Sequence, residues 1–264
     1  MNDGTSAANR TVISIAGADI EIFERGQGAP ILFLHGAQGV MPADHFLGLL
    51  ARNRHVVAPS HPGFGQSSLP DWLDSVEDIA HIYLELMDRL NIGSVDLVGC
   101  SIGGWIAADM ATKTPERLQH LVLVGPVGVK VGPIDKLDIP DIFAMPQDKL
   151  DALLYHSPKK SAPNFKTVSE QQLRTFVRNR ETLALLAWEP YMHNPKLRRR
   201  LHRAIAPALF VRGASDGLVS AEYLAGYSAL LPNAKTITIA EAGHGPQVEQ
   251  PEALAKAVLD FLGT

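Results

Sequence analysis

At 264 residues, the chain has the length of one large α/β domain with room for an inserted subdomain. Apolar residues make up 46% of it, which supports a sizeable core and excludes a disordered protein. The formal net charge of −4 gives no reason to expect a nucleic acid as partner. The single cysteine, Cys100, excludes an intrachain disulfide framework and a zinc site built from cysteines.

The N-terminal segment MNDGTSAANR predicts a loose start and lacks the apolar core of a signal peptide. No apolar run approaches the ~20 residues that a membrane span needs. We therefore expect a cytoplasmic protein without membrane contact. The one dense basic cluster, in residues 198–203, predicts a solvated helix face.

Strand and helix patterns alternate along most of the chain. Two alternating runs at residues 11–15 and 19–23 predict an antiparallel hairpin. Further strands are predicted at residues 31–34, 55–58, 95–98, 121–124, 208–212 and 236–239. Helices are predicted at residues 42–51, 75–90, 102–112, 220–231 and 247–262. This order is typical of an α/β protein with a mostly parallel central sheet and helices on both faces.

The alternation of strand and helix patterns stops between residues 126 and 194. Proline breaks separate helical patterns there, and no apolar strand pattern occurs. Helices are predicted at residues 146–156 and 169–188, and Ser169 with Gln172 forms a capping box for the second. Asn194-Pro195 predicts the start of a third. We therefore predict a first core part at residues 1–125, a helical cap at 126–194 and a second core part at 195–264.

The motif Gly99-Cys100-Ser101-Ile102-Gly103 joins a predicted strand to an alanine-rich helix. Strand, Gly-x-Ser-x-Gly and helix in this order predict a nucleophile elbow, a sharp turn that exposes the serine at a helix N-terminus. Gly99 and Gly103 supply the small residues that such a turn needs. A chance match in a glycine-rich turn is the alternative, which the flanking strand and helix disfavour. We interpret Cys100 as a buried packing residue.

A serine hydroxyl needs a nearby base, and the base needs a third group that orients it. His244 follows the last strand, where the carboxyl ends of parallel strands converge. Asp216 follows the preceding strand and is the predicted acid, whereas Glu241 shares the loop of His244 and is the weaker candidate. The alternatives are a surface histidine and a turn-capping aspartate. Ser101, Asp216 and His244 are thus the candidate catalytic residues.

The elbow motif, Asp216 and His244, in the chain order Ser, Asp, His, resemble the α/β-hydrolase fold superfamily. His35-Gly36, residues 62–67 and the helical insertion extend this resemblance over nearly the whole chain from about residue 10. The resemblance implies an α/β-hydrolase fold with an inserted cap.

The resemblance also implies an oxyanion hole made of backbone N–H groups. Ile102 supplies one donor, and Ala37 the second, with Gln38 as the runner-up. It implies a structural hydrogen bond for His35, and we interpret His61 as part of the loop structure. No metal or organic cofactor is expected.

Five side chains are predicted to contact the substrate: Gln38, Trp105, Arg178, Trp188 and His193. The expected partners are a small acyl substrate and water, with no nucleic acid and no membrane. A homodimer is compatible with the sequence.

The sequence favours a serine hydrolase that cleaves a small carboxylic ester or similar acyl substrate through an acyl-enzyme. A second hypothesis is a carbon–carbon bond hydrolase of aromatic ring-fission products. Such enzymes tend to carry Asn before the serine and Trp after the histidine, where this chain has Cys100 and Gly245. A third, from another class, is a ligand-sensing receptor with very slow turnover. Dehalogenases and epoxide hydrolases of this fold use an Asp nucleophile, so Ser101 argues against both.

Overall fold

A computed structural model describes residues 8–263, and the predicted loose start in residues 1–7 lies outside this range. Among the described residues, eight strands form one sheet in the order β1-β2-β4-β3-β5-β6-β7-β8. The strands are β1 (Asn9–Ile15), β2 (Ala18–Arg25), β3 (Pro30–Leu34), β4 (His55–Pro59), β5 (Val95–Cys100), β6 (Leu118–Val124), β7 (Ala208–Gly213) and β8 (Ala234–Ile239).

Strand directions follow the predicted pattern. β1 and β2 form the antiparallel hairpin, and β2 also pairs antiparallel with β4. From β4 through β3, β5, β6 and β7 to β8, each neighbouring pair runs parallel. The prediction of a mostly parallel sheet is therefore confirmed, and the carboxyl ends of these strands meet at one edge.

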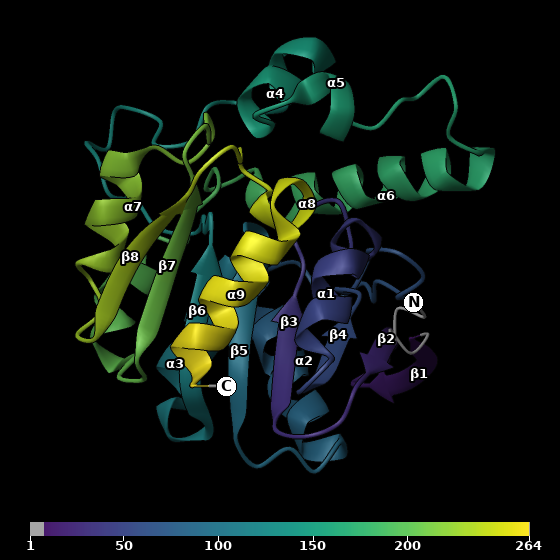
Figure 1. The fold of residues 1–264 in the computed structure, drawn as a ribbon, viewed down its shortest axis with the longest axis vertical. Coiled ribbons are helices and arrows are strands. Elements are labelled where there is room, and N and C mark those ends of the chain that lie inside the picture. Colours follow the sequence, from purple (N-terminus) through teal and green to yellow (C-terminus); the bar gives the residue numbers. More distant parts are fainter. Residues whose placement is uncertain (1–7, 264) are drawn as a thin grey trace.

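Helices cover both faces of the sheet (Figure 1). Apolar side chains of α1 (Asp44–Leu50) and α9 (Pro251–Leu262) are buried against one face. Those of α2 (Val76–Arg89), α3 (Ile102–Lys113) and α7 (Ala221–Ser228) are buried against the other. Short 3-10 turns lie at Met41–Ala43 and Pro115–Arg117. No helix among residues 8–263 is long and apolar enough to cross a membrane.

The closing helix is shorter than the sequence predicts. The structure divides residues 247–262 into α8 (Pro246–Glu249) and α9, with Gln250 between them at φ −139° and ψ 56°. Pro251 has no N–H and disfavours helical geometry in the residue before it, which explains the break.

An insertion between β6 and β7 lies over the carboxyl edge of the sheet and carries α4 (Gln147–Leu154), α5 (Pro158–Ser161) and α6 (Glu170–Ala187) (Figure 1). Three side chains of α6 dock on the loop after β4. Arg178 donates to the Gly65 and Ser67 carbonyls at 2.8 and 2.5 Å, and Thr182 donates to the Gly63 carbonyl at 2.9 Å. Asn179 accepts from the Gly65 N–H at 3.0 Å, and these contacts fix α6 on the core.

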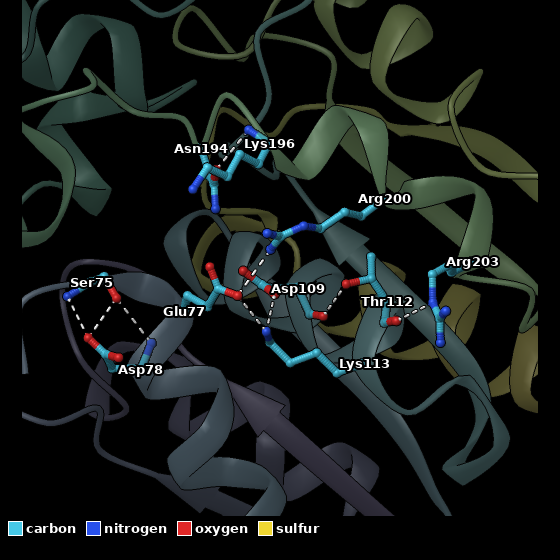
Figure 2. A network of polar contacts seen from close by, with 10 residues as sticks. All are labelled: Ser75, Glu77, Asp78, Asp109, Thr112, Lys113, Asn194, Lys196, Arg200 and Arg203. Carbon is cyan, nitrogen blue, oxygen red and sulfur yellow. Dashed lines mark hydrogen bonds and ion pairs between the residues drawn. The ribbon is translucent and has the colours of Figure 1, made fainter.

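The return from the insertion to β7 differs from its prediction. A third helix is expected after Asn194, but the chain forms two 3-10 turns, Leu197–Arg199 and Leu201–Arg203. Most basic residues of the predicted cluster are exposed, as expected, but two of them also bind the core, as Figure 2 shows. Arg200 donates to Glu77 of α2 at 3.0 Å, and Arg203 donates to the Thr112 carbonyl in the last turn of α3 at 2.9 Å. The cluster anchors the end of the insertion, and a cation near a helix C-terminus is favourable.

Candidate active site

The turn between β5 and α3 has the geometry of a nucleophile elbow. Ser101 lies at φ 54° and ψ −116°, a strained conformation for a residue with a side chain. A Cβ on Gly103 would lie 2.1 Å from the Leu34 carbonyl oxygen, and one on Gly99 would lie 2.4 Å from the Gly103 carbonyl oxygen. The two glycines are therefore required by close backbone approach, as the motif predicts.

The three candidate catalytic side chains meet at the carboxyl edge of the sheet. Ser101 Oγ lies 2.9 Å from His244 Nε2, and His244 Nδ1 lies 3.0 Å from Asp216 Oδ2. In the tautomer with a proton on Nδ1, His244 donates to the carboxylate and accepts the serine hydroxyl proton. This is the arrangement in which an imidazole can act as the base for a serine.

Asp216 is held in place by its own loop. Its Oδ1 accepts the N–H groups of Leu218 and Val219, each at 2.9 Å, while Oδ2 faces His244. The carboxylate is nearly fully buried, at 3% exposure of the residue. Glu241, the weaker candidate, is exposed, and among the described residues it makes no hydrogen bond or ion pair with His244.

Two backbone N–H groups at the cavity are candidates for an oxyanion hole. Ala37 and Ile102 both line the cavity beside Ser101, and neither N–H has an acceptor among residues 8–263. Ile102 is the first residue of α3, so its N–H has no partner within the helix. Gly36, which precedes Ala37, lies beside the nucleophile, since a Cβ there would be in van der Waals contact with Ser101 Cβ at 3.4 Å.

A stack of two fully buried histidines supports the loop that carries Ala37. The rings of His35 and His61 lie 3.7 Å apart. His35 Nε2 accepts the His61 N–H at 2.9 Å and Nδ1 donates to the Gly36 carbonyl, while His61 Nε2 donates to the His35 carbonyl at 2.8 Å. Burial lowers the pKa of His35 to about 4. Burial, and to a smaller extent the proximity of His35, also lowers the pKa of His61. Both rings are therefore neutral at pH 7.

The cavity at Ser101 lies between the core and the insertion. Besides Ser101 and His244, the polar residues in its wall are Gln38, Gln147, Tyr155, Arg180 and Gln247. The insertion supplies apolar side chains as well: Ile142, Leu150, Leu154, Phe176, Leu183 and Met192. Cys100 also reaches the lining, but burial raises the pKa of its thiol to about 12, so the thiol stays protonated.

Of the five side chains predicted to contact substrate, Gln38 lines the cavity, where its amide donates to the Tyr155 hydroxyl. Arg178 lies outside the lining, because it docks α6 on the core. Arg180, two residues further and therefore rotated by roughly 200° around the helix, reaches the cavity instead.

The other three predicted contacts also lie outside the lining. Trp105 is buried beneath Gly128, where a Cβ would lie 2.3 Å from the Trp105 Cγ. Trp188 is 55% exposed and packs on the Phe143 ring. His193 points its Nδ1 to the Tyr191 carbonyl at 2.8 Å. Packing of the insertion, rather than residue type, determines which of its side chains reach the cavity.

Sequence reasoning missed Arg180 and Tyr155. A signal for Arg180 exists, since Phe176, Arg180 and Leu183 are spaced four and three residues apart and so share one face of α6. All three line the cavity. Tyr155 follows α4 without any comparable pattern, and only the packing of the insertion places it there.

Comparison with known proteins agrees with this architecture. A model of the alpha/beta hydrolase family matches residues 31–257, which is most of the chain. The chain belongs to the alpha/beta hydrolase family. With Ser101 hydrogen-bonded to His244 at the cavity, it is a serine hydrolase of that family.

Individual relatives are distant. The chain is 27% identical to the 2-hydroxy-6-oxo-2,4-heptadienoate hydrolase of Pseudomonas putida, covering 99% of this chain and 99% of the relative. A bacterial membrane phospholipase A has a TM-score of 0.83 at 24% identity, covering 99% of this chain and 87% of that chain. An esterase of Thermogutta terrifontis has a TM-score of 0.77 at 22% identity, covering 98% of each chain. The two structures show the fold.

Proposed function

We propose that this protein hydrolyses a carbon–carbon bond beside a ketone in a small substrate that carries a carboxylate. The observation that carries the proposal is Arg180, a residue in the wall of the cavity that holds Ser101. It donates to the Ile142 carbonyl at 2.8 Å and lies over the Phe143 ring, and it makes no ion pair among residues 8–263. A cation without an ion-pair partner among the described residues, at an otherwise largely apolar wall, suits an anionic end group.

The named substrate of the Pseudomonas putida relative supports the same reading. A 2-hydroxy-6-oxo-2,4-heptadienoate combines a carboxylate, a conjugated hydrocarbon chain and a ketone. The apolar side chains of the insertion suit such a chain between the Arg180 end and the Ser101 end of the cavity. We further infer that residues 126–194 act as a cap that shields it from water.

In the proposed mechanism, Ser101 Oγ attacks the ketone carbon while His244 Nε2 takes its proton. Asp216 orients the imidazole and stabilises its positive charge, and the N–H groups of Ala37 and Ile102 bind the oxyanion. The bond breaks in the 2-oxo tautomer of the substrate, in which the 2-hydroxyl proton has moved to the carbon beside the ketone. The electron pair of the bond between this carbon and the ketone carbon then forms a dienolate conjugated with the 2-oxo group, and the proton held by His244 neutralises this leaving group. His244 next deprotonates a water, which releases the acyl group from Ser101 as a carboxylic acid.

Ester hydrolysis is the second candidate, and two residues favour it. Cys100 and Gly245 stand where carbon–carbon hydrolases of this kind tend to carry Asn and Trp. The same Ser101, His244 and oxyanion donors would cleave an ester, with an alcohol as the leaving group. Arg180 would then have no anionic partner in a neutral substrate, which is why we place this candidate second.

The test compares a 2-hydroxy-6-oxo-dienoate with neutral p-nitrophenyl esters on wild type, Ser101→Ala and Arg180→Gln. We expect multiple turnover of the dienoate, lost in Ser101→Ala. Arg180→Gln should raise KM about tenfold or more for the dienoate, since a charged hydrogen bond contributes about 1.5–3 kcal/mol, and far less for the ester. Arg174→Gln on the exposed face of α6 is the matched control.

Each outcome decides between the candidates. Ester turnover that exceeds dienoate turnover would replace the first candidate with the second. Covalent labelling of Ser101 without turnover of either substrate would point to ligand sensing. Unchanged hydrolysis in Ser101→Ala would reject the assignment of the nucleophile itself.

A further inference from the structure

Residues 153–157 of the insertion lie directly on the two loops that carry the acid and the base. The Gly217 N–H, next to the acid, donates to the Leu153 carbonyl at 3.0 Å. The backbone N–H of His244 donates to the Leu154 carbonyl at 2.7 Å. We call residues 153–157 the strap, because this short segment crosses both loops.

The sequence of both loops is adapted to this contact. A Cβ on Gly243, which precedes the base, would lie 2.3 Å from the Leu154 carbonyl oxygen. A Cβ on Gly217, which follows the acid, would lie 2.8 Å from a methyl carbon of Leu153 and 3.1 Å from its carbonyl oxygen. A side chain at Gly243 would overlap the strap backbone, and one at Gly217 would press on Leu153, so glycine at both positions permits the close approach.

One carboxylate fastens the strap to the loop of the base. Glu249 Oε2 accepts the N–H of Gly243 at 2.7 Å and the N–H of His156 at 3.0 Å. Its Oε1 accepts the Ser157 N–H and the Ser161 hydroxyl, each at 2.9 Å. Glu249 therefore bridges the residue before His244 and three donors in the insertion.

The carboxylate is charged at neutral pH. Burial raises the pKa of Glu249, but the hydrogen bonds from the three backbone N–H groups and the Ser161 hydroxyl outweigh burial and lower the pKa below its usual value. Hydrogen bonds to a charged acceptor are short and stronger than neutral ones.

We propose that Glu249 is a positioning residue, which holds His244 in reach of Ser101 by fastening its loop to the strap. The insertion is then part of the catalytic apparatus at this edge rather than a lid that lifts away from it. The inference rests on the proposed roles of Ser101 and His244, and it holds whichever bond the protein cleaves.

The test replaces Glu249 with Gln, whose NH₂ group faces two of the four donors and can satisfy neither. We measure the labelling rate of Ser101 by a fluorophosphonate, and kcat and KM for p-nitrophenyl acetate, all per active site. Labelling rate and kcat should fall by about 10- to 100-fold, because a shift of about 1 Å at a reacting group costs roughly 10²-fold. KM should stay within about twofold, since the substrate wall is intact.

Three further variants sharpen the test. Glu252→Gln is the matched control, because it removes the same charge three residues later from an exposed side chain whose ion-pair partner is His45, outside the strap and the loop of the base. Glu249→Asp keeps the charge with less reach and should restore part of the rate. Ser161→Ala removes one donor of the insertion and should cost no more than about threefold.

A labelling rate per active site within twofold of wild type in Glu249→Gln would overturn the inference, as would an equal loss in Glu252→Gln. A purely structural role would lower the fraction of folded protein without changing the rate per site. If Glu249→Gln does not fold, Glu249→Asp and Ser161→Ala must show graded losses, and unchanged rates in both overturn the proposal. Labelling that persists in Ser101→Ala would instead reject the proposed function.

Discussion

The nucleophile side of the site and the α6 side of the insertion are held together by different forces. On the nucleophile side, backbone segments touch, so that Gly103 has no room for a methyl group against Leu34. On the insertion side, side chains such as Arg178 reach backbone groups more than a hundred residues away. Close packing tolerates almost no change, whereas a hydrogen bond contributes about 1 kcal/mol. Substitutions should therefore have large effects on the first side and graded effects on the second.

The largest effect is expected for Asp216→Asn. The Asn side-chain oxygen can still accept from Leu218 and Val219, but its NH₂ group then faces His244 Nδ1 and forces the wrong tautomer. We expect kcat to fall by about 10⁴-fold with little change in Tm. Steady-state kinetics and thermal unfolding measure both, and a loss smaller than tenfold would reject the role of Asp216.

Gly103→Ala tests the close packing of the nucleophile side. Its Cβ would lie 2.1 Å from the Leu34 carbonyl oxygen, so the strand or the helix must move, and the free energy of unfolding should fall by about 3 kcal/mol. Gly245→Ala is the matched control, because the nearest atom to its Cβ would be 3.4 Å away. Its effect should stay within about 0.5 kcal/mol in urea unfolding. Equal effects would mean that the elbow is not tightly packed.

The sequence predicts the nucleophile side well because its constraints are local. The elbow motif, its two glycines and the strand before it are neighbours in the chain, and His244 and Asp216 each follow a predicted strand. The insertion is different. Nothing near Arg178 or Arg180 in the chain shows which of them docks on the core and which reaches the cavity, because their partners lie far away in sequence.

The buried histidine stack should make the nucleophile side sensitive to acid. The pKa of His35 falls from 6.5 to about 4 on folding, so unfolded chains bind more protons between these values. The contribution of His35 to the free energy of unfolding is complete above pH 6.5. It is lost as the pH falls to about 4, by roughly 3 kcal/mol. Urea unfolding at several pH values measures this slope. The slope of the unfolding free energy against pH should be shallower in His35→Gln. An unchanged slope would contradict the lowered pKa of His35.

The smallest effect is expected on the insertion side, for Arg178→Ala. The variant loses the two hydrogen bonds to Gly65 and Ser67, while Asn179 and Thr182 still hold α6 on the loop. We expect the free energy of unfolding to fall by about 1–2 kcal/mol and KM to rise severalfold, because α6 carries part of the cavity wall. Substituting the exposed Arg174 in the same helix should change neither quantity. A loss of kcat as large as that of Asp216→Asn would mean that α6, like the strap, positions the catalytic groups, and the contrast between the two sides would then fail.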